Sequence, residues 1–276
     1  MAKAFVFGST LVLLVFSMAG AITGKNYAET TVTEEEQDVH AETIDSNLIV
    51  LELFTSQGCS SCPPADKFLR ELADDPKWAG RVLPLSFHVD YWNYLGWKDP
   101  FSKPAWTERQ GDYVQAMGGA TMYTPQIVIH GRDEAVGSRF QQVRRALEKQ
   151  AGNPNAHLID ISVESLERGE KSLNGEIKVS GQLPAARSAY ALVGIAFQKG
   201  LSTDIRKGEN AGKTLKNDFV VRNLKVLSQL QESTNLDLNK TFKIALDKDI
   251  SSDQLGLAVL VQNLESMEIV GAAVRF

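Results

Sequence analysis

The first clear pattern in the chain is Leu48–Phe54, a nearly continuous apolar run. A run of this length predicts a strand of a parallel sheet that other elements cover on both faces. The polar residues Thr55–Gly58 end this strand. Residues 63–74 then place apolar side chains at helical spacing, so a helix is expected directly after the strand.

Alternating strands and helices are predicted from there to about residue 150. Further strands are expected at 82–89, 126–130 and 134–136, and further helices at 103–117 and 138–150. The resulting order is β-α-β-α-β-β-α. Two crossover units followed by a hairpin and a helix predict a three-layer α/β domain over residues 47–152.

The pattern changes at Gly152–Asn155, which has the composition of a loop. Beyond it, apolar and polar residues alternate in short segments at 157–165, 172–180, 188–198, 216–230, 240–247, 255–262 and 267–276. Short strands at this spacing predict an all-β, sandwich-like domain over residues 155–276. The polar loop Gly208–Lys213 is either a plain hairpin end or a segment that reaches across to the first domain.

Residues 1–21 have the pattern of a secretory signal peptide. Lys3 precedes an apolar stretch, and Ala19–Ala21 supplies a small-residue cleavage site. An uncleaved anchor is the alternative, although the apolar stretch is shorter than the ~20 residues that span a membrane. Residues 22–46 are acidic and poor in apolar side chains, which predicts a disordered tether. The expected location is periplasmic or secreted, with no membrane contact beyond the signal segment.

Composition narrows the choice of function. The 276 residues carry a net charge of −5 and 43% hydrophobic side chains, which is ordinary for a globular protein and disfavours nucleic acid as a partner. The chain has two cysteines, Cys59 and Cys62. A framework of several disulfides is therefore excluded, and any bridge within the chain is local.

The two cysteines lie where the predicted strand passes into the predicted helix. A helix N-terminus carries unpaired N–H groups and partial positive charge, which stabilise a thiolate. Because Pro63 and Pro64 suit only a first helical turn, the helix is expected to start near Ser61 as its N-cap. Cys59 would then lie outside the helix, toward solvent, as the attacking thiol. Cys62 would lie in the first turn as the resolving thiol.

The element order, the CxxC and the Thr124-Pro125 pair before the third strand together resemble the thioredoxin superfamily. The resemblance implies an α/β thioredoxin-like domain and a cis-proline at Pro125 that faces the cysteines. It also implies that Thr124 and Pro125 help to hold an extended peptide substrate. The chain departs from thioredoxins at Gly58, where they carry Trp, and at Leu53, where they carry a buried Asp.

Four segments resemble more closely the secreted bacterial thioredoxin-like family called domain of unknown function 1223. They are ELFTSQGCSSCPPAD (52–66), FHVDYWNYLGWKDPF (87–101), MYTPQIVIHGR (122–132) and GENAGKTLKNDFVVRNL (208–224). The resemblance covers residues 47–276. It implies the fold and a two-part layout, and it assigns no activity.

Several side chains near the expected strand ends are candidates for auxiliary roles. Tyr91 and Trp92, in an aromatic loop after the second strand, either bind a peptide or apolar substrate or belong to a small satellite core. His88 and Asp90 are candidates for a base or a metal ligand. Glu52 either accepts a proton during exchange or is held by a cation, and strand alternation directs it away from the face where Leu53 lies.

Three functions fit these residues. The first is an exported thiol–disulfide oxidoreductase acting on protein or small thiols with an unidentified redox partner. It would need no cofactor beyond the Cys59–Cys62 pair. The second is a Cu(I) carrier using the same two thiolates, with His88 as a third ligand. The third is an adaptor whose β-domain binds a partner while the CxxC senses redox state. Zinc is disfavoured because the four histidines lack ligand spacing.

Overall fold

The computed structural model describes residues 48–185, 189–231, 235–247, 250 and 254–276. All of these residues belong to one unit, His40–Phe276. The expected signal peptide at 1–21 and acidic tether at 22–46 lie outside the described residues. Across the described ranges, no helix has both the length and the apolar character needed to cross a membrane.

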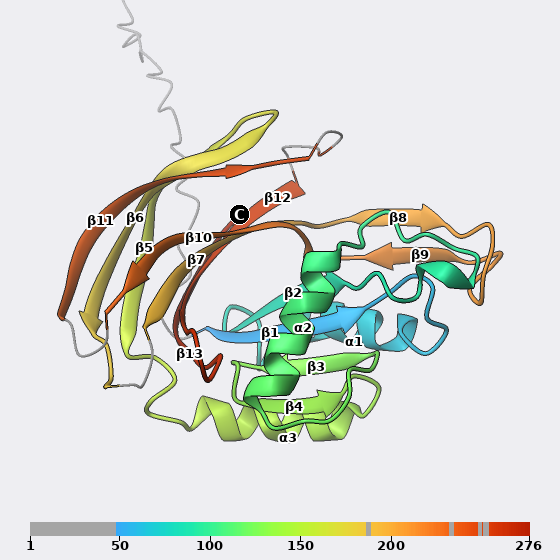
Figure 1. Cartoon of the computed structure of the whole chain (residues 1–276), viewed down its shortest axis with the longest axis horizontal. Helices are drawn as coiled ribbons and strands as arrows, with labels where there is room; N and C mark the ends of the chain where they lie inside the picture. Colours follow the sequence, from blue (N-terminus) through green and yellow to red (C-terminus); the bar gives the residue numbers. More distant parts are fainter. Residues whose placement is uncertain (1–47, 186–188, 232–234, 248–249, 251–253) are drawn as a thin grey trace, which may run out of the picture. The chain divides into compact units, whose positions relative to one another are not determined.

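Strands and helices alternate in the first part of the chain (Figure 1). In order, they are β1 (Ile49–Thr55), α1 (Pro63–Asp74), β2 (Val82–His88), the short 3₁₀ helix η1 (Asn93–Leu95), α2 (Pro104–Ala116), β3 (Gln126–Ile129), β4 (Asp133–Val136) and α3 (Phe140–Ala151). Every strand and helix expected between residues 48 and 150 is present, with ends that differ by no more than two residues.

Only strands follow α3 in the described part of the chain. They are β5 (Ile159–Arg168), β6 (Ser172–Gln182), β7 (Tyr190–Gln198), β8 (Leu201–Asp204), β9 (Thr214–Asn217), β10 (Val220–Leu230), β11 (Asn235–Ala245), β12 (Leu255–Asn263) and β13 (Ile269–Arg275). The sequence pattern missed β8 and merged β9 with β10, because β8 and β9 are four-residue strands with mostly polar side chains.

The expected fold class, a thioredoxin-like α/β domain followed by a β-sandwich, is wrong. One mixed sheet of eight strands, in the order β13-β12-β7-β10-β2-β1-β3-β4, takes strands from both parts of the chain. β10 joins β2 in parallel through Val220 and Ser86, and the Ser86 N–H donates to Phe219 O at 2.8 Å. An open edge of β2 would expose unpaired backbone groups, and β10 satisfies them. The periodicity shows that a segment is a strand but not which strand pairs with it.

Three hydrophobic layers hold this arrangement together. Alternate residues of β1 point to opposite faces, so Leu51 packs with α1 and α3 while Val50 packs toward α2. The layer under α2 continues without a break onto β7, β12 and β13. The far face of those strands packs against a three-stranded sheet, β11-β6-β5, through side chains such as Leu192 and Ile177. The apolar layers therefore tie the two parts of the chain together, as the sheet does.

Candidate functional site

A disulfide between Cys59 and Cys62 lies at the junction of β1 and α1. Cys62, rather than Ser61, is the N-cap of α1, and Pro63 is the first helical residue. Both cysteines have an exposed fraction of 0%. The expectation that Cys59 faces solvent is therefore wrong, because a segment from the second part of the chain covers it.

The covering segment is the loop between β8 and β9. The buried side-chain amide of Asn210 donates to Gln57 O at 2.9 Å and to Cys59 O at 3.0 Å. Glu209 Oε2 accepts a hydrogen bond of 3.0 Å from Ser60 N. Of the two expectations for Gly208–Lys213, the plain hairpin end is wrong and the segment that reaches across is confirmed.

The side chain of Gln57 forms hydrogen bonds with both strands that flank this loop. Its side-chain nitrogen donates to Thr203 Oγ1 on β8 at 3.0 Å and to Asn217 Oδ1 on β9 at 2.9 Å. Its side-chain oxygen accepts from Trp97 Nε1 at 3.2 Å. Gly208, at φ +78°, turns the chain over Trp97, where an added Cβ would meet the Trp97 Cβ at 3.1 Å. The hairpin is thus bound to the CxxC segment through side chains that fit together closely.

On another side of the disulfide lie Thr124 and Pro125. The Thr124–Pro125 peptide bond is cis, as expected. Thr124 Oγ1 donates to Cys59 Sγ at 3.3 Å and accepts from Trp92 Nε1 at 2.8 Å. Trp92 is half-buried. The hydroxyl of Thr124 connects this residue of the aromatic loop to the sulfur of Cys59.

Tyr91 and Asp90, in the same aromatic loop, form hydrogen bonds with side chains of α2. Tyr91 donates to Gln110 on α2 at 3.2 Å, and burial raises the pKa of Tyr91 to about 12. Asp90 accepts a hydrogen bond of 2.6 Å from Thr107 on α2. Both side chains are bonded to α2, and Tyr91 also interacts with the side chain of Thr124, the residue that contacts Cys59 Sγ.

Glu52 is held by a cation, which was one of its two expected roles. Arg109 donates to both carboxylate oxygens at 2.6 and 2.7 Å, and Tyr113 donates to one of them at 2.6 Å. These partners come from α2, whereas the cysteines begin α1. Because α1 and α2 pack on opposite faces of the sheet, Glu52 lies across the sheet from the helix that carries the disulfide.

His88 forms a buried pair with Asp99. His88 Nδ1 and Asp99 Oδ2 are 2.7 Å apart, and both side chains are fully buried. Burial alone would lower the pKa of His88, but the charge and hydrogen bond of Asp99 outweigh burial and raise it. The charge of His88 likewise holds the pKa of Asp99 below its ordinary value. Asp99 also accepts from Gln57 N at 2.8 Å, so the pair lies directly beneath the CxxC turn.

Asp66 completes the polar set around the disulfide. Its Oδ2 accepts a hydrogen bond of 3.1 Å from Thr55 Oγ1, at the end of β1. Burial raises the pKa of Asp66 to about 7, against the charge of His88, the Thr55 hydrogen bond and the charge of Arg70. Asp66 Oδ1 and His88 Nε2 are both buried without a hydrogen-bond partner in the described structure.

The sequence interpretation missed Gln57, Asp66 and Asp99, and it included Glu209 and Asn210 only as members of the loop Gly208–Lys213, with two alternatives left open. Asp66 had a local signal, because it follows Cys62 by four residues and so lies on the same side of α1. Apart from the pair of His88 and Asp99, the other contacts join residues between 40 and 160 positions apart. No spacing along the chain indicates such contacts.

The described residues contain no group of three or more His, Cys, Asp or Glu side chains arranged to hold a metal ion. Nδ1 of His88 is occupied by Asp99. His88 Nε2 has no hydrogen-bond partner in the described structure, so a Cu(I) ion would have the reduced sulfurs of Cys59 and Cys62 as ligands and this nitrogen as the candidate third ligand.

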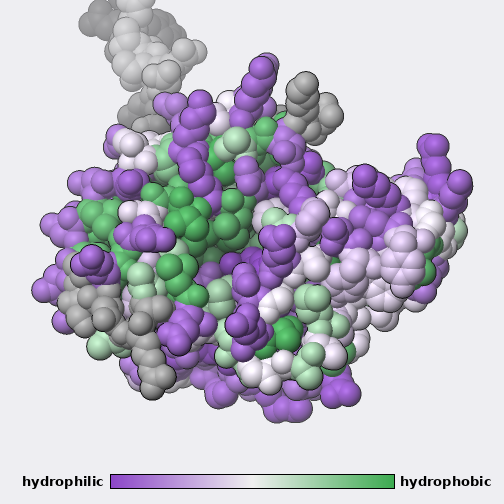
Figure 2. All heavy atoms as spheres, in the orientation of Figure 1, coloured by the Kyte–Doolittle hydropathy of each residue, from purple (hydrophilic) through white to green (hydrophobic). Residues whose placement is uncertain are grey.

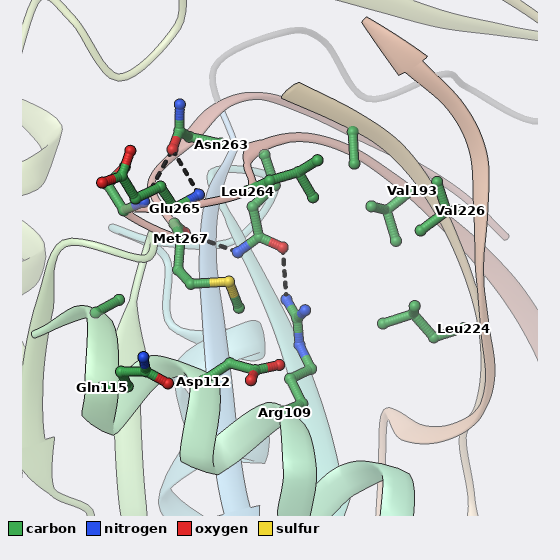
Figure 3. A pocket seen from close by; sticks show the side chains of 14 residues that line it. Arg109, Asp112, Gln115, Val193, Leu224, Val226, Asn263, Leu264, Glu265 and Met267 are labelled. Carbon is green, nitrogen blue, oxygen red and sulfur yellow. Dashed lines mark hydrogen bonds between the residues drawn. The ribbon is translucent and has the colours of Figure 1, made fainter. Parts of the chain in front are cut away.

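A pocket of about 950 Å³ lies between α2, β7, β10 and the turn from β12 to β13 (Figure 3). Val193, Leu224 and Val226 give it an apolar side, in the region where Figure 2 shows hydrophobic side chains gathered over the sheets. Arg109 points toward Gln262 across the pocket and donates to it at 3.1 Å. None of the expected site residues lines this pocket.

A mixed sheet with a buried CxxC disulfide at a strand–helix junction, beside a cis-proline, defines a class of disulfide-bearing α+β proteins. The family model described as "Protein of unknown function (DUF1223)" matches residues 50–262, and the chain belongs to this family.

The solved structures similar to this chain include two that match over most of its length. A protein from Agrobacterium tumefaciens is 29% identical with a TM-score of 0.58, over 83% of this chain and 93% of that one. HBP35 of Porphyromonas gingivalis has a TM-score of 0.58 at 15% identity, over 83% of this chain and 75% of that one, which shows a likeness of fold alone. No curated protein matches the chain.

Proposed function

We propose that the protein is a thiol–disulfide oxidoreductase that acts on protein or small-molecule thiols through Cys59 and Cys62. The observation that carries the proposal is the contact of Thr124 Oγ1 with Cys59 Sγ, at 3.3 Å, beside the cis peptide bond of Pro125. A hydroxyl donor at this sulfur can stabilise negative charge that develops on it during exchange. The start of α1 adds its partial positive charge.

In the oxidising direction, a substrate thiolate attacks Cys59 Sγ. The bond between Cys59 and Cys62 breaks, a mixed disulfide forms, and Cys62 leaves as a thiolate. A second substrate thiolate then attacks the substrate sulfur of the mixed disulfide and releases Cys59. The substrate dithiol loses two electrons and the pair gains them. The reducing direction is the reverse of these steps, and a dithiol donor must then reduce the pair again.

Substrate access is part of the proposal, because both sulfurs are buried. The loop that carries Glu209 and Asn210 would move away to admit the substrate, and Trp92 with Thr124 would contact it next to Cys59. The relation to the thioredoxin superfamily belongs to this proposal too. It rests on the CxxC and the cis-proline, since the sheet as a whole differs. We also propose a periplasmic or secreted location from residues 1–21, and a redox partner that is unidentified.

The test is the equilibrium of the pair with glutathione, read as a mass shift after thiol labelling. A potential of about −120 to −180 mV would indicate an oxidase or isomerase, and one of about −270 mV a reductase. Cys59→Ser should abolish turnover of a model protein disulfide, whereas Ser60→Ala should retain it. Turnover by Cys59→Ser, or a pair that stays closed far below this range, would overturn the proposal.

A redox-sensing adaptor is the second candidate, and the contacts of Asn210 with Gln57 and Cys59 favour it. Breaking the disulfide would change the turn that these contacts hold. Reduction should then increase hydrogen exchange in the loop between β8 and β9, without any turnover of substrate. Tight, stoichiometric Cu(I) binding by the reduced protein would instead favour a carrier.

A further inference from the structure

The proposed exchange steps leave Asp66, the half-buried acid on α1, without a role. Cys62 has φ −78° and ψ −40°, so it continues the helical path of α1 backward, and Asp66 N donates to Cys62 O at 3.1 Å. Helical residues four apart have Cβ atoms about 5–6 Å apart. Because helical side chains lean toward the N-terminus, the carboxyl group of Asp66 lies over the turn that holds Cys62.

The surroundings of Asp66 suit a group that gains and loses a proton. Oδ2 has one hydrogen bond, from Thr55, and Oδ1 is buried with no partner in the described residues. A buried carboxylate oxygen without a donor is costly, and protonation removes much of that cost. The charged groups that act on Asp66 come from three elements. They are His88 on β2, Asp99 after η1 and Arg70 on α1.

Asp66 also has a path to solvent. A cleft of about 250 Å³ runs between α1 and β9. It is lined by Pro63, Asp66, Lys67, Arg70, Thr214, Leu215, Lys216 and Asn217. The disulfide itself is fully buried. A proton that leaves Cys62 can therefore reach water through Asp66, while the sulfurs stay covered.

We propose that Asp66 is the proton acceptor and donor for Cys62, with the His88–Asp99 pair as the positioning group that sets its charge. This inference rests on the proposed function. When a mixed disulfide on Cys59 is resolved, the Cys62 thiol transfers its proton to the Asp66 carboxylate. The Cys62 thiolate then attacks Cys59 Sγ, the intramolecular disulfide forms, and the substrate thiolate leaves. When the pair is reduced, protonated Asp66 returns the proton to Cys62.

The test uses the pH dependence of the reduction potential of the Cys59–Cys62 pair. If Asp66 exchanges its proton with Cys62, its affinity for that proton differs between the oxidised and reduced states. The potential should then change slope near the pH at which Asp66 titrates, about 7. Asp66→Asn should remove this change of slope. Asp74→Asn, on the exposed face of the same helix, should keep it.

A second measurement follows the rate. Near pH 7, Asp66→Asn should slow resolution of a mixed disulfide on Cys59 by a factor of about 10², the lower end of general-base contributions. Thr55→Val removes the hydrogen bond that favours ionised Asp66 and should move the change of slope to higher pH. If Asp66→Asn does not fold, the shift of the change of slope in Thr55→Val tests the inference instead.

The inference is overturned if the wild type shows no change of slope, or if Asp66→Asn retains it. Both results can be obtained with glutathione or dithiothreitol, so they do not depend on a physiological substrate. A protein that shows the Asp66-dependent slope but turns over no protein disulfide would contradict the proposed function and leave the role of Asp66 intact.

Discussion

The side-chain amide of Asn210 donates a 3.0 Å hydrogen bond to the backbone carbonyl of Cys59, 151 residues earlier in the chain. The same amide donates to Gln57 O at 2.9 Å. One asparagine therefore closes the loop between β8 and β9 over the turn that carries the disulfide. Access to the sulfurs depends on whether this loop is closed or open.

Asn210→Ala should make the disulfide easier to reduce. The substitution removes a hydrogen bond from Lys213 within the loop and two that join the loop to the disulfide turn, and each of these two contributes about 0.5–1.5 kcal/mol. The open form of the loop should therefore be populated about tenfold more. The check is the rate of reduction by dithiothreitol. Asn155→Ala is the control, because the hydrogen bonds of the exposed Asn155 involve its backbone N–H and carbonyl, which alanine keeps. An unchanged rate for Asn210→Ala would mean that the loop does not limit access.

Acid should loosen the loop through Glu209. Its hydrogen bonds with Ser60 lower the pKa of this carboxyl below 4.5, so the contact is fully present above that pH and is lost as pH falls through the folded-state pKa. Reduction by a phosphine, which remains active in acid, should accelerate in the wild type once the pH falls below 4.5 and passes through the lowered pKa of Glu209. In Glu209→Gln the rate should be higher at neutral pH and nearly independent of pH in this range. Equal pH profiles for the two proteins would contradict the prediction.

Breaking the buried pair of Glu52 and Arg109 should destabilise the fold and leave the exchange chemistry unchanged. Glu52 is 1% exposed, and Arg109 would be left without its counter-charge. Glu52→Gln should lower the free energy of unfolding by about 3–5 kcal/mol in urea titrations. Glu71→Gln, on the surface of α1, should have almost no effect. If Glu52→Gln instead slowed disulfide resolution at unchanged stability, Glu52 would be the proton acceptor.

The pair of His88 and Asp99 should make stability depend on pH in the opposite sense to Glu209. The pKa of His88 is raised in the folded state above its ordinary 6.5. The contribution of His88 is therefore fully present below pH 6.5 and is lost as pH rises through the folded-state pKa. Asp66, Asp99 and Arg222 also act on His88, so the measured quantity is the difference between wild type and His88→Gln in urea unfolding. That difference should shrink with rising pH, and a constant difference would show that folding leaves the pKa of His88 unchanged.

The residues around the disulfide show what local sequence can predict. Leu48–Phe54 indicated a strand buried on both faces, and the CxxC with Pro63 indicated the start of a helix. Both features depend on residues that are close together in the sequence. The cis bond at Pro125 came from a resemblance, and the structure confirms it. The cover over Cys59 was only one of two alternatives for Gly208–Lys213, because it depends on how two distant parts of the chain dock.

The fold class failed for a related reason. The alternation in residues 220–230 correctly predicted a strand, but period two is the same whether a strand pairs within its own domain or with β2. The pairing depends on the open edge of β2 at Ser86 and on the apolar layer that continues from α2 to β7. These are properties of assembled elements. In the sequence alone, the residues that make this pairing cannot be told apart from those of any other buried strand.

The pairing of β2 with β10 also fixes an order of events as the chain is made. β1, α1 and the two cysteines emerge long before residue 220, so thiols and oxidants in the surroundings can reach Cys59 and Cys62 while β2 still has an unpaired edge. Contacts of this long range form late in folding. The two thiols are therefore accessible on the nascent chain and become enclosed only after the loop with Glu209 and Asn210, and then β10, have been added.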